Sequence, residues 1–156
     1  MDLFAEVVGL AGALDAASID YAICGGIALA IHGAPRATRD IDILARESDL
    51  SRLRTVLHAR GFTIEALPMI FSSTGVSIQR FTRIDPDGAT LMLDVLLAEG
   101  ALATVWDTRT RVTLELGELS VVSRDGLISL KVTAGRPQDL VDIQRLKEVS
   151  RGEDDT

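Results

Sequence analysis

One stretch, residues 21–44, limits what this chain can fold into more than any other part of its sequence. Within it an apolar strand is predicted to end in a glycine pair, Gly25-Gly26, which turns the chain into a short helix over residues 27–32. Glycine at such a junction lets backbone N–H groups approach a bound group without an intervening Cβ atom, and a helix start offers unpaired donors. The pair therefore predicts a phosphate site, and a plain tight turn is the alternative.

Asp40 and Asp42 occupy alternate positions of the apolar strand that follows. Residues two apart in a strand point to the same face, so the two carboxylates are expected to project together, ~6–7 Å apart along the strand. Two like charges at a core strand repel each other unless a cation neutralises them, and a hard divalent metal with oxygen ligands does so. For an isolated Asp-x-Asp tripeptide, a solvated strand face or a helix N-cap is the alternative.

Asp94 lies in the middle of an almost wholly apolar strand, the second half of a predicted hairpin. A buried carboxylate without a partner is costly, so Asp94 must be paired, neutral or bound to metal. We interpret it as the third member of a metal triad with Asp40 and Asp42. The alternative is an ion pair to Arg80 or Arg83 on the partner strand.

The glycine pair, the short helix and the Asp-x-Asp strand together resemble the signature of the nucleotidyltransferase superfamily of polymerase-β type. The string from Gly25 to Leu44 is more narrowly similar to minimal bacterial members, which include the transferase toxins of abortive-infection toxin–antitoxin systems. The resemblance covers roughly residues 19–45, 90–97 and 124–146. It implies an α+β, nucleotidyltransferase-like fold: a mixed central β-sheet flanked by helices, with C-terminal helices.

The C-terminal part adds to the same resemblance. Minimal transferases carry a lysine on the penultimate helix and an Arg-x-Lys-Asp-x-x-Asp string that opens the last helix. The matching residues here are Lys131, Arg136, Asp139 and Asp142, while Gln138 stands in the place of the string's lysine. Lys131 on a mostly apolar helix has two interpretations, a contact to triphosphate or an ion pair with Asp139 or Asp142. Asp139 in a first helical turn also has an ordinary dipole explanation.

The resemblance implies a metal-dependent enzyme that moves a nucleoside monophosphate from a nucleoside triphosphate, such as ATP, to a hydroxyl acceptor. Asp40, Asp42 and Asp94 would bind two Mg²⁺ ions, with Mn²⁺ as a substitute, and Asp94 would take the proton of the acceptor. The residues expected to hold the triphosphate are Gly25, Gly26, Arg36, Arg39, Lys131 and Asp139.

The expected acceptor is an RNA end, particularly of tRNA, or a protein hydroxyl. If the chain is a toxin, it would have a cognate antitoxin. One alternative is a catalytically weak or inactive module of the same fold that binds nucleotide or a protein partner. A sugar transferase that uses Asp-x-Asp with a nucleotide sugar is a weaker alternative, because a chain of this length leaves no room for a doubly wound nucleotide-binding half.

Length and charge limit the remaining possibilities. A chain of 156 residues predicts one domain over residues 1–150, followed by an acidic tail, 151–156, expected to be disordered. Sixteen basic against twenty-three acidic residues give a net charge of −7, which disfavours a grip on long duplex DNA. No apolar run approaches the ~20 residues needed to span a bilayer. The single cysteine, Cys24, and the absence of a basic N-terminal region favour a cytoplasmic protein without a membrane partner.

Overall fold

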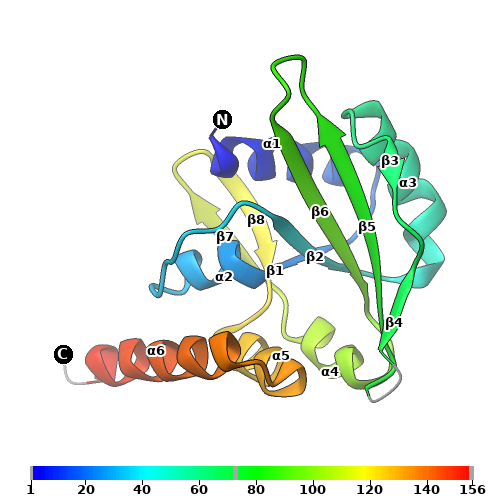
Figure 1. Cartoon of the computed structure of the whole chain (residues 1–156). Helices are drawn as coiled ribbons and strands as arrows, with labels where there is room; N and C mark the ends of the chain where they lie inside the picture. Colours follow the sequence, from blue (N-terminus) through cyan, green and yellow to red (C-terminus); the bar gives the residue numbers. More distant parts are fainter. Residues whose placement is uncertain (1, 72–73, 155–156) are drawn as a thin grey trace.

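The computed structural model describes residues 2–71 and 74–154 of the chain (Figure 1). The helices are α1 (Leu3–Ala16), α2 (Gly25–Ile31), α3 (Leu50–Ala59), α4 (Ala103–Asp107), α5 (Arg124–Ala134) and α6 (Pro137–Asp154), with short 3₁₀ helices η1 (Glu47–Asp49) and η2 (Gly100–Leu102). The strands are β1 (Ala22–Cys24), β2 (Ile41–Ala45), β3 (Ile64–Glu65), β4 (Met69–Phe71), β5 (Val76–Ile84), β6 (Thr90–Leu97), β7 (Thr110–Leu114) and β8 (Gly117–Val121).

The strands of this part of the chain form one eight-stranded sheet in the order β3-β5-β6-β2-β1-β8-β7, with β4 also paired to β5. The sheet is mixed, because β2 runs parallel to β6 and β1 runs parallel to β8, while the other described pairs are antiparallel. β2 and β6 are central and almost wholly apolar, as strands covered on both faces must be. The predicted α+β class with a mixed central sheet, flanking helices and C-terminal helices is confirmed.

Apolar stripes attach the helices to the sheet. α1 buries a helically spaced set of side chains against it: Val7, Leu10, Ala11 and Leu14. Figure 1 shows α1 and α3 behind the sheet, and α5 and α6 side by side below it. The core is mostly aliphatic, and Tyr21, Phe62 and Phe81 are its largest fully buried side chains. Among the described helices, none is long and apolar enough to cross a bilayer.

Several boundaries differ from the sequence predictions. α2 begins at Gly25 instead of residue 27, so the glycine pair forms the first turn of the helix. Asp40 lies one residue before β2. The predicted loop over residues 66–75 contains β4, which forms because Met69–Phe71 find open backbone groups on β5. α6 continues through Asp154, into the segment predicted to be a disordered tail, and residues 155–156 lie outside the described part.

Candidate active site

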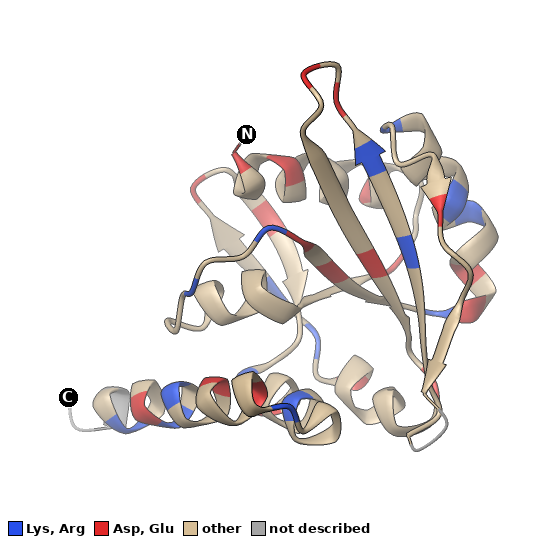
Figure 2. Ribbon diagram, viewed as in Figure 1, with Lys and Arg blue, Asp and Glu red and all other residues tan. Residues whose placement is uncertain are grey.

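A row of four side chains crosses the middle of the sheet, one each from β1, β2, β6 and β5. Cys24 is the register partner of Asp42, Asp42 of Asp94, and Asp94 of Arg80. Residues directly opposite each other on neighbouring strands project from the same face of a sheet. Figure 2 shows acidic bands side by side on β2 and β6 and a basic band next to them on β5. The fold therefore places Asp42, Asp94 and Arg80 on one face.

Asp42 is the most perturbed carboxylate of this row. Its pKa is raised from 3.8 to about 7, chiefly by burial and in addition by the negative charges of Asp94 and Asp40. Lys131 and Arg80 oppose the shift without cancelling it. Such a cluster is relieved by a proton or by a bound cation, and perturbed groups of this kind concentrate at functional sites.

Asp94 has a different environment, because Arg80 holds it with two hydrogen bonds. Nε of Arg80 donates to Oδ1 at 2.8 Å, and Nη2 donates to Oδ2 at 2.9 Å. The contact raises the pKa of Arg80, chiefly through these hydrogen bonds. The ion pair considered as the alternative role of Asp94 is therefore present. Arg83, the other arginine considered, instead binds Glu6 and Asp85.

The donor chemistry of Asp40, Asp42 and Asp94 fits a hard divalent cation. Carboxylate oxygens are the ligands that Mg²⁺ prefers, and the pKa of Asp42 is raised by burial and then by the charges of Asp94 and Asp40, which a cation would offset. In residues 2–71 and 74–154, however, no group of three acidic, histidine or cysteine side chains is arranged to hold a metal as it stands. Both oxygens of Asp94 are engaged by Arg80. The metal triad stays a prediction.

The glycine pair allows two side chains to approach the start of α2 closely. Gly25 has φ +65°, and a Cβ atom there would lie 2.1 Å from Oδ2 of Asp42. At Gly26 a Cβ atom would lie 2.6 Å from Oγ1 of Thr38. The space freed at this turn is thus filled by Asp42 and by Thr38 of the basic loop. The backbone of the helix start therefore lies directly against Asp42, and a phosphate bound by the two glycines would meet that carboxylate.

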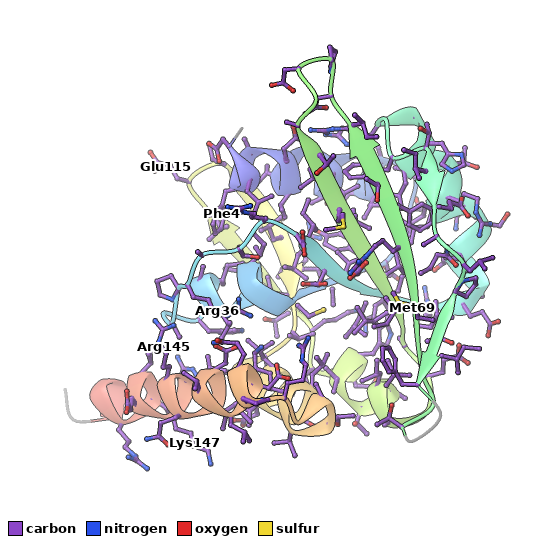
Figure 3. All side chains as sticks on the ribbon, in the orientation of Figure 1. Phe4, Arg36, Met69, Glu115, Arg145 and Lys147 are labelled. Atoms are coloured by element: carbon purple, nitrogen blue, oxygen red, sulfur yellow. The ribbon has the colours of Figure 1, made fainter. Side chains whose placement is uncertain are left out.

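Lys131 belongs to a buried ion cluster where α5 meets α6. The lysine is 3% exposed, and its Nζ lies 2.9 Å from Oδ2 of Asp142 and 3.5 Å from Oδ1 of Asp139. Burial opposes ionisation of Asp142, yet hydrogen bonds from Lys131 and Gln138 lower its pKa. Arg36, which Figure 3 labels between α2 and the C-terminal helices, reaches the same carboxylate. Its Nε lies 3.3 Å from Oδ1 of Asp142. The ion pairs considered as the alternative for Lys131 are therefore formed.

Asp139 completes this cluster at the start of α6. Its Oδ2 accepts from the backbone N–H of Arg136 at 3.1 Å and from Nε of the same residue at 2.7 Å, as an acidic residue in a first turn does when it caps a helix. Burial works against the charge, but these contacts lower the pKa of Asp139. Three of the residues predicted to hold triphosphate are therefore already engaged in this cluster. Lys131 binds Asp139 directly, and Arg36 and Lys131 share the carboxylate of Asp142.

Arg39 differs from these residues, since it is exposed and has no hydrogen-bond or ion-pair partner among the residues described. It is the predicted phosphate ligand that is free to meet an incoming anion. Two residues of the site were not singled out from the sequence as ligands: Arg80 and Asp142. Arg80 entered only as a partner for Asp94, and Asp142 only as a match to the C-terminal string.

Several solved structures share this fold. The solution structure of the antibiotic-resistance factor ANT(2″)-Ia aligns with a TM-score of 0.61 at 15% identity, over 97% of this chain and 85% of that one. The lincosamide adenylyltransferase LnuA with bound lincomycin gives 0.53 at 14%, over 87% and 90%. An antigenic nucleotidyltransferase-like protein from Paracoccidioides brasiliensis gives 0.57 at 22%, over 90% and 73%. These likenesses define the fold.

The sequence itself defines the family. The family model of aminoglycoside-2″-adenylyltransferase matches residues 6–121, which include β1, α2, β2 and the β5–β6 hairpin. The chain belongs to this family, and with it to the nucleotidyltransferases, enzymes that transfer a nucleoside monophosphate to a hydroxyl acceptor. No curated protein matches the chain.

Proposed function

We propose that this protein is a Mg²⁺-dependent nucleotidyltransferase that moves AMP from ATP to a hydroxyl of a small, positively charged acceptor of the aminoglycoside type. The observation that carries the proposal is the register of Asp42 and Asp94 on neighbouring parallel strands, against the glycine pair that starts α2. The family match over residues 6–121 supports the same chemistry.

Each residue of the site has a task in this proposal. Gly25 and Gly26 present backbone N–H groups to the triphosphate, and Arg39 binds its outer oxygens. Two divalent cations held by the carboxylates would neutralise the phosphates and align the attacking and leaving oxygens. Asp94 lies between Asp42 and Arg80 and takes the proton from the acceptor hydroxyl as the hydroxyl attacks.

The charge of the chain favours a cationic acceptor over a nucleic acid. A net charge of −7 attracts a molecule that carries several amino groups and disfavours the long phosphate backbone of a nucleic acid. Two of the similar structures are a lincosamide antibiotic adenylyltransferase and the antibiotic-resistance factor ANT(2″)-Ia, and ANT(2″)-Ia has also been solved with adenylyl-2″-tobramycin. The RNA or protein acceptor, the toxin role with its antitoxin, and the inactive binding module remain predictions from the sequence alone.

Transfer of label from [α-³²P]ATP tests the proposal. The purified chain is incubated with tobramycin, lincomycin or total tRNA, in Mg²⁺, in Mn²⁺ or in excess EDTA. Labelled tobramycin and released pyrophosphate are expected with either metal and not in EDTA. Asp42→Asn should abolish transfer, whereas Asp87→Asn, in the exposed turn of the β5–β6 hairpin, should not. ATP binding by calorimetry without transfer to any acceptor would instead support a binding module.

A further inference from the structure

Arg80 contributes a positive charge to a row of acidic residues at the point where a divalent cation is expected. Its guanidinium spans both oxygens of Asp94, at 2.8 and 2.9 Å, and Asp94 is only 8% exposed. Asp42 stands on the other side of Asp94 in the same row. A cation bound between Asp42 and Asp94 would therefore contact the Asp94 carboxylate from one side. The guanidinium of Arg80 contacts the same carboxylate from the other side.

The Arg80 side chain is free to leave this position. It is 37% exposed, and Asp94 is the one hydrogen-bond partner that it has within the described part of the chain. Arg83 on the same strand offers a contrast, since it is 14% exposed and is held by both Glu6 and Asp85. An exposed guanidinium with one partner moves at a lower cost than a buried one with two.

We propose that Arg80 is a positioning residue that acts as the counter-ion of Asp94 in the metal-free protein and competes with the divalent cation for that carboxylate. This inference rests on the metal dependence in the proposed function. When the cation binds, the guanidinium gives up at least one of its two hydrogen bonds, because two cations on one carboxylate repel each other. Asp94 thereby reaches the metal already oriented, and Arg80 offsets part of the negative charge of the site when no metal is bound.

Binding of Mn²⁺, measured by electron paramagnetic resonance of the free ion, tests the competition. Arg80→Gln should bind Mn²⁺ more tightly than the natural chain, on the order of threefold to tenfold, because a competing positive charge is removed. Arg80→Lys keeps the charge but not the paired geometry, and should lie between the two. Arg83→Gln removes an arginine of the same strand that does not touch Asp94, and should leave Mn²⁺ affinity unchanged.

A second measurement follows the guanidinium itself. In ¹H–¹⁵N spectra the Nε–H signal of Arg80, assigned by its loss in Arg80→Gln, should shift when Mg²⁺ is added. The Nε–H signal of Arg83 should stay in place. This readout requires neither nucleotide nor turnover, and it follows the natural chain even if a variant folds poorly.

The outcomes separate this inference from the proposed function. Unchanged or weaker Mn²⁺ binding by Arg80→Gln would overturn the competition while leaving the metal site intact; Arg80 would then support the site by orienting Asp94. An Nε–H signal of Arg80 that does not shift when Mg²⁺ is added would also contradict the proposed competition. If the natural chain binds no Mn²⁺ and Asp42→Asn leaves the transfer rate unchanged, the proposed metal dependence is wrong. The inference about Arg80 is then wrong as well.

Discussion

Asp94 is the register partner of Asp42 across the parallel strands β2 and β6, yet the two carboxylates have different surroundings. Asp94 accepts two hydrogen bonds from Arg80, while Asp42 accepts none from any described residue and has its pKa raised to about 7. Two neighbouring carboxylates whose environments differ in this way can serve different tasks in one reaction. The charge of Asp42 changes near neutral pH.

Asp42→Asn should therefore stabilise the metal-free protein at alkaline pH. The folded chain keeps a proton on Asp42 up to about pH 7, whereas the unfolded chain releases it near 3.8. Because the folded state binds more protons in that window, stability contributed by Asp42 is present at low pH and is lost as the pH rises toward 7. The asparagine has no such dependence. The free energy of unfolding of Asp42→Asn should therefore exceed that of the natural chain by roughly 2–4 kcal/mol above pH 7.

Urea denaturation in EDTA, repeated at several values between about pH 5 and pH 8, measures this difference. Asp87→Asn serves as the control, since Asp87 lies in an exposed turn away from the carboxylate pair. A stability difference that stays constant with pH would mean that the pKa of the half-buried Asp42 is not raised as described above.

Gly25→Ala should cost both stability and activity. The new Cβ would sit 2.1 Å from Oδ2 of Asp42, at a residue whose φ of +65° already disfavours a side chain. Backbone strain alone costs about 1–2 kcal/mol, and displacement of Asp42 should lower the transfer rate by about a hundredfold. Thermal unfolding and the ATP transfer assay measure the two effects.

Gly88→Ala separates these two causes. Gly88 has φ +87° with open space where a Cβ would go, so the substitution introduces the strain without a clash. It should lower stability by about 1–2 kcal/mol and leave transfer unchanged. Equal activity losses in the two variants would contradict the close approach between Gly25 and Asp42.

Lys131→Met should destabilise the fold, with or without ATP. The substitution leaves Asp142, 0% exposed, and Asp139, 1% exposed, without their lysine in the interior. Loss of one partner from a buried ion pair costs about 3–5 kcal/mol. In the double variant with Asp142→Asn, the loss should be smaller than the sum of the single losses, because Asp142, which keeps Arg36 and Gln138 as partners, is then neutral.

Lys147→Met is the control for this cycle, since Lys147 is an exposed lysine of α6. Chemical denaturation gives the stabilities, and calorimetry gives the affinity for ATP. A Lys131→Met chain of unchanged stability that binds ATP poorly would show instead that the lysine is a nucleotide ligand, as the family resemblance implies.

The pairing of Arg80 with Asp94 could not be read directly from the sequence. The predicted turn at residues 85–88 pairs residue 84 with residue 89, and counting back from it places Gln79 opposite Asp94. The structure instead pairs Ile84 with Thr90, so Arg80 lies opposite Asp94. The parallel neighbour of Asp94 was not countable, because the connection from β2 to β6 is long and passes through η1, α3 and three strands.

The ion cluster at the α5–α6 junction shows the limit of local patterns. Lys131, Asp139 and Asp142 were recognised as charged residues on apolar helices, and their mutual pairing was one of two interpretations. Arg36, from the loop before β2, joins them only because α2 packs against α5. The spacing of residues in the sequence does not predict the contact between Arg36 and Asp142, because it depends on how the helices pack against one another and against the sheet.

Glu6→Gln should weaken the attachment of α1 to β5 without affecting transfer. Nη1 and Nη2 of Arg83 both donate to Glu6 at 2.9 Å, and these hydrogen bonds lower the pKa of that carboxyl. A charge-assisted pair of this kind contributes about 1–3 kcal/mol at neutral pH. Because the folded-state pKa lies below the ordinary 4.5, the contribution is present above pH 4.5 and is lost as the pH falls through the folded value.

Urea denaturation of Glu6→Gln and of the natural chain at about pH 7 and about pH 4 measures the contribution. The difference between the two proteins should narrow toward the acidic end, opposite in direction to the effect at Asp42. Glu118→Gln, at an exposed pair with Arg111, should change stability little, because such pairs contribute about 0–1 kcal/mol. The contact between Glu6 and Arg83 lies at the outer end of β5, so we expect no loss of transfer in Glu6→Gln. A lower transfer rate at unchanged stability would contradict this placement of α1 relative to the carboxylates of the site.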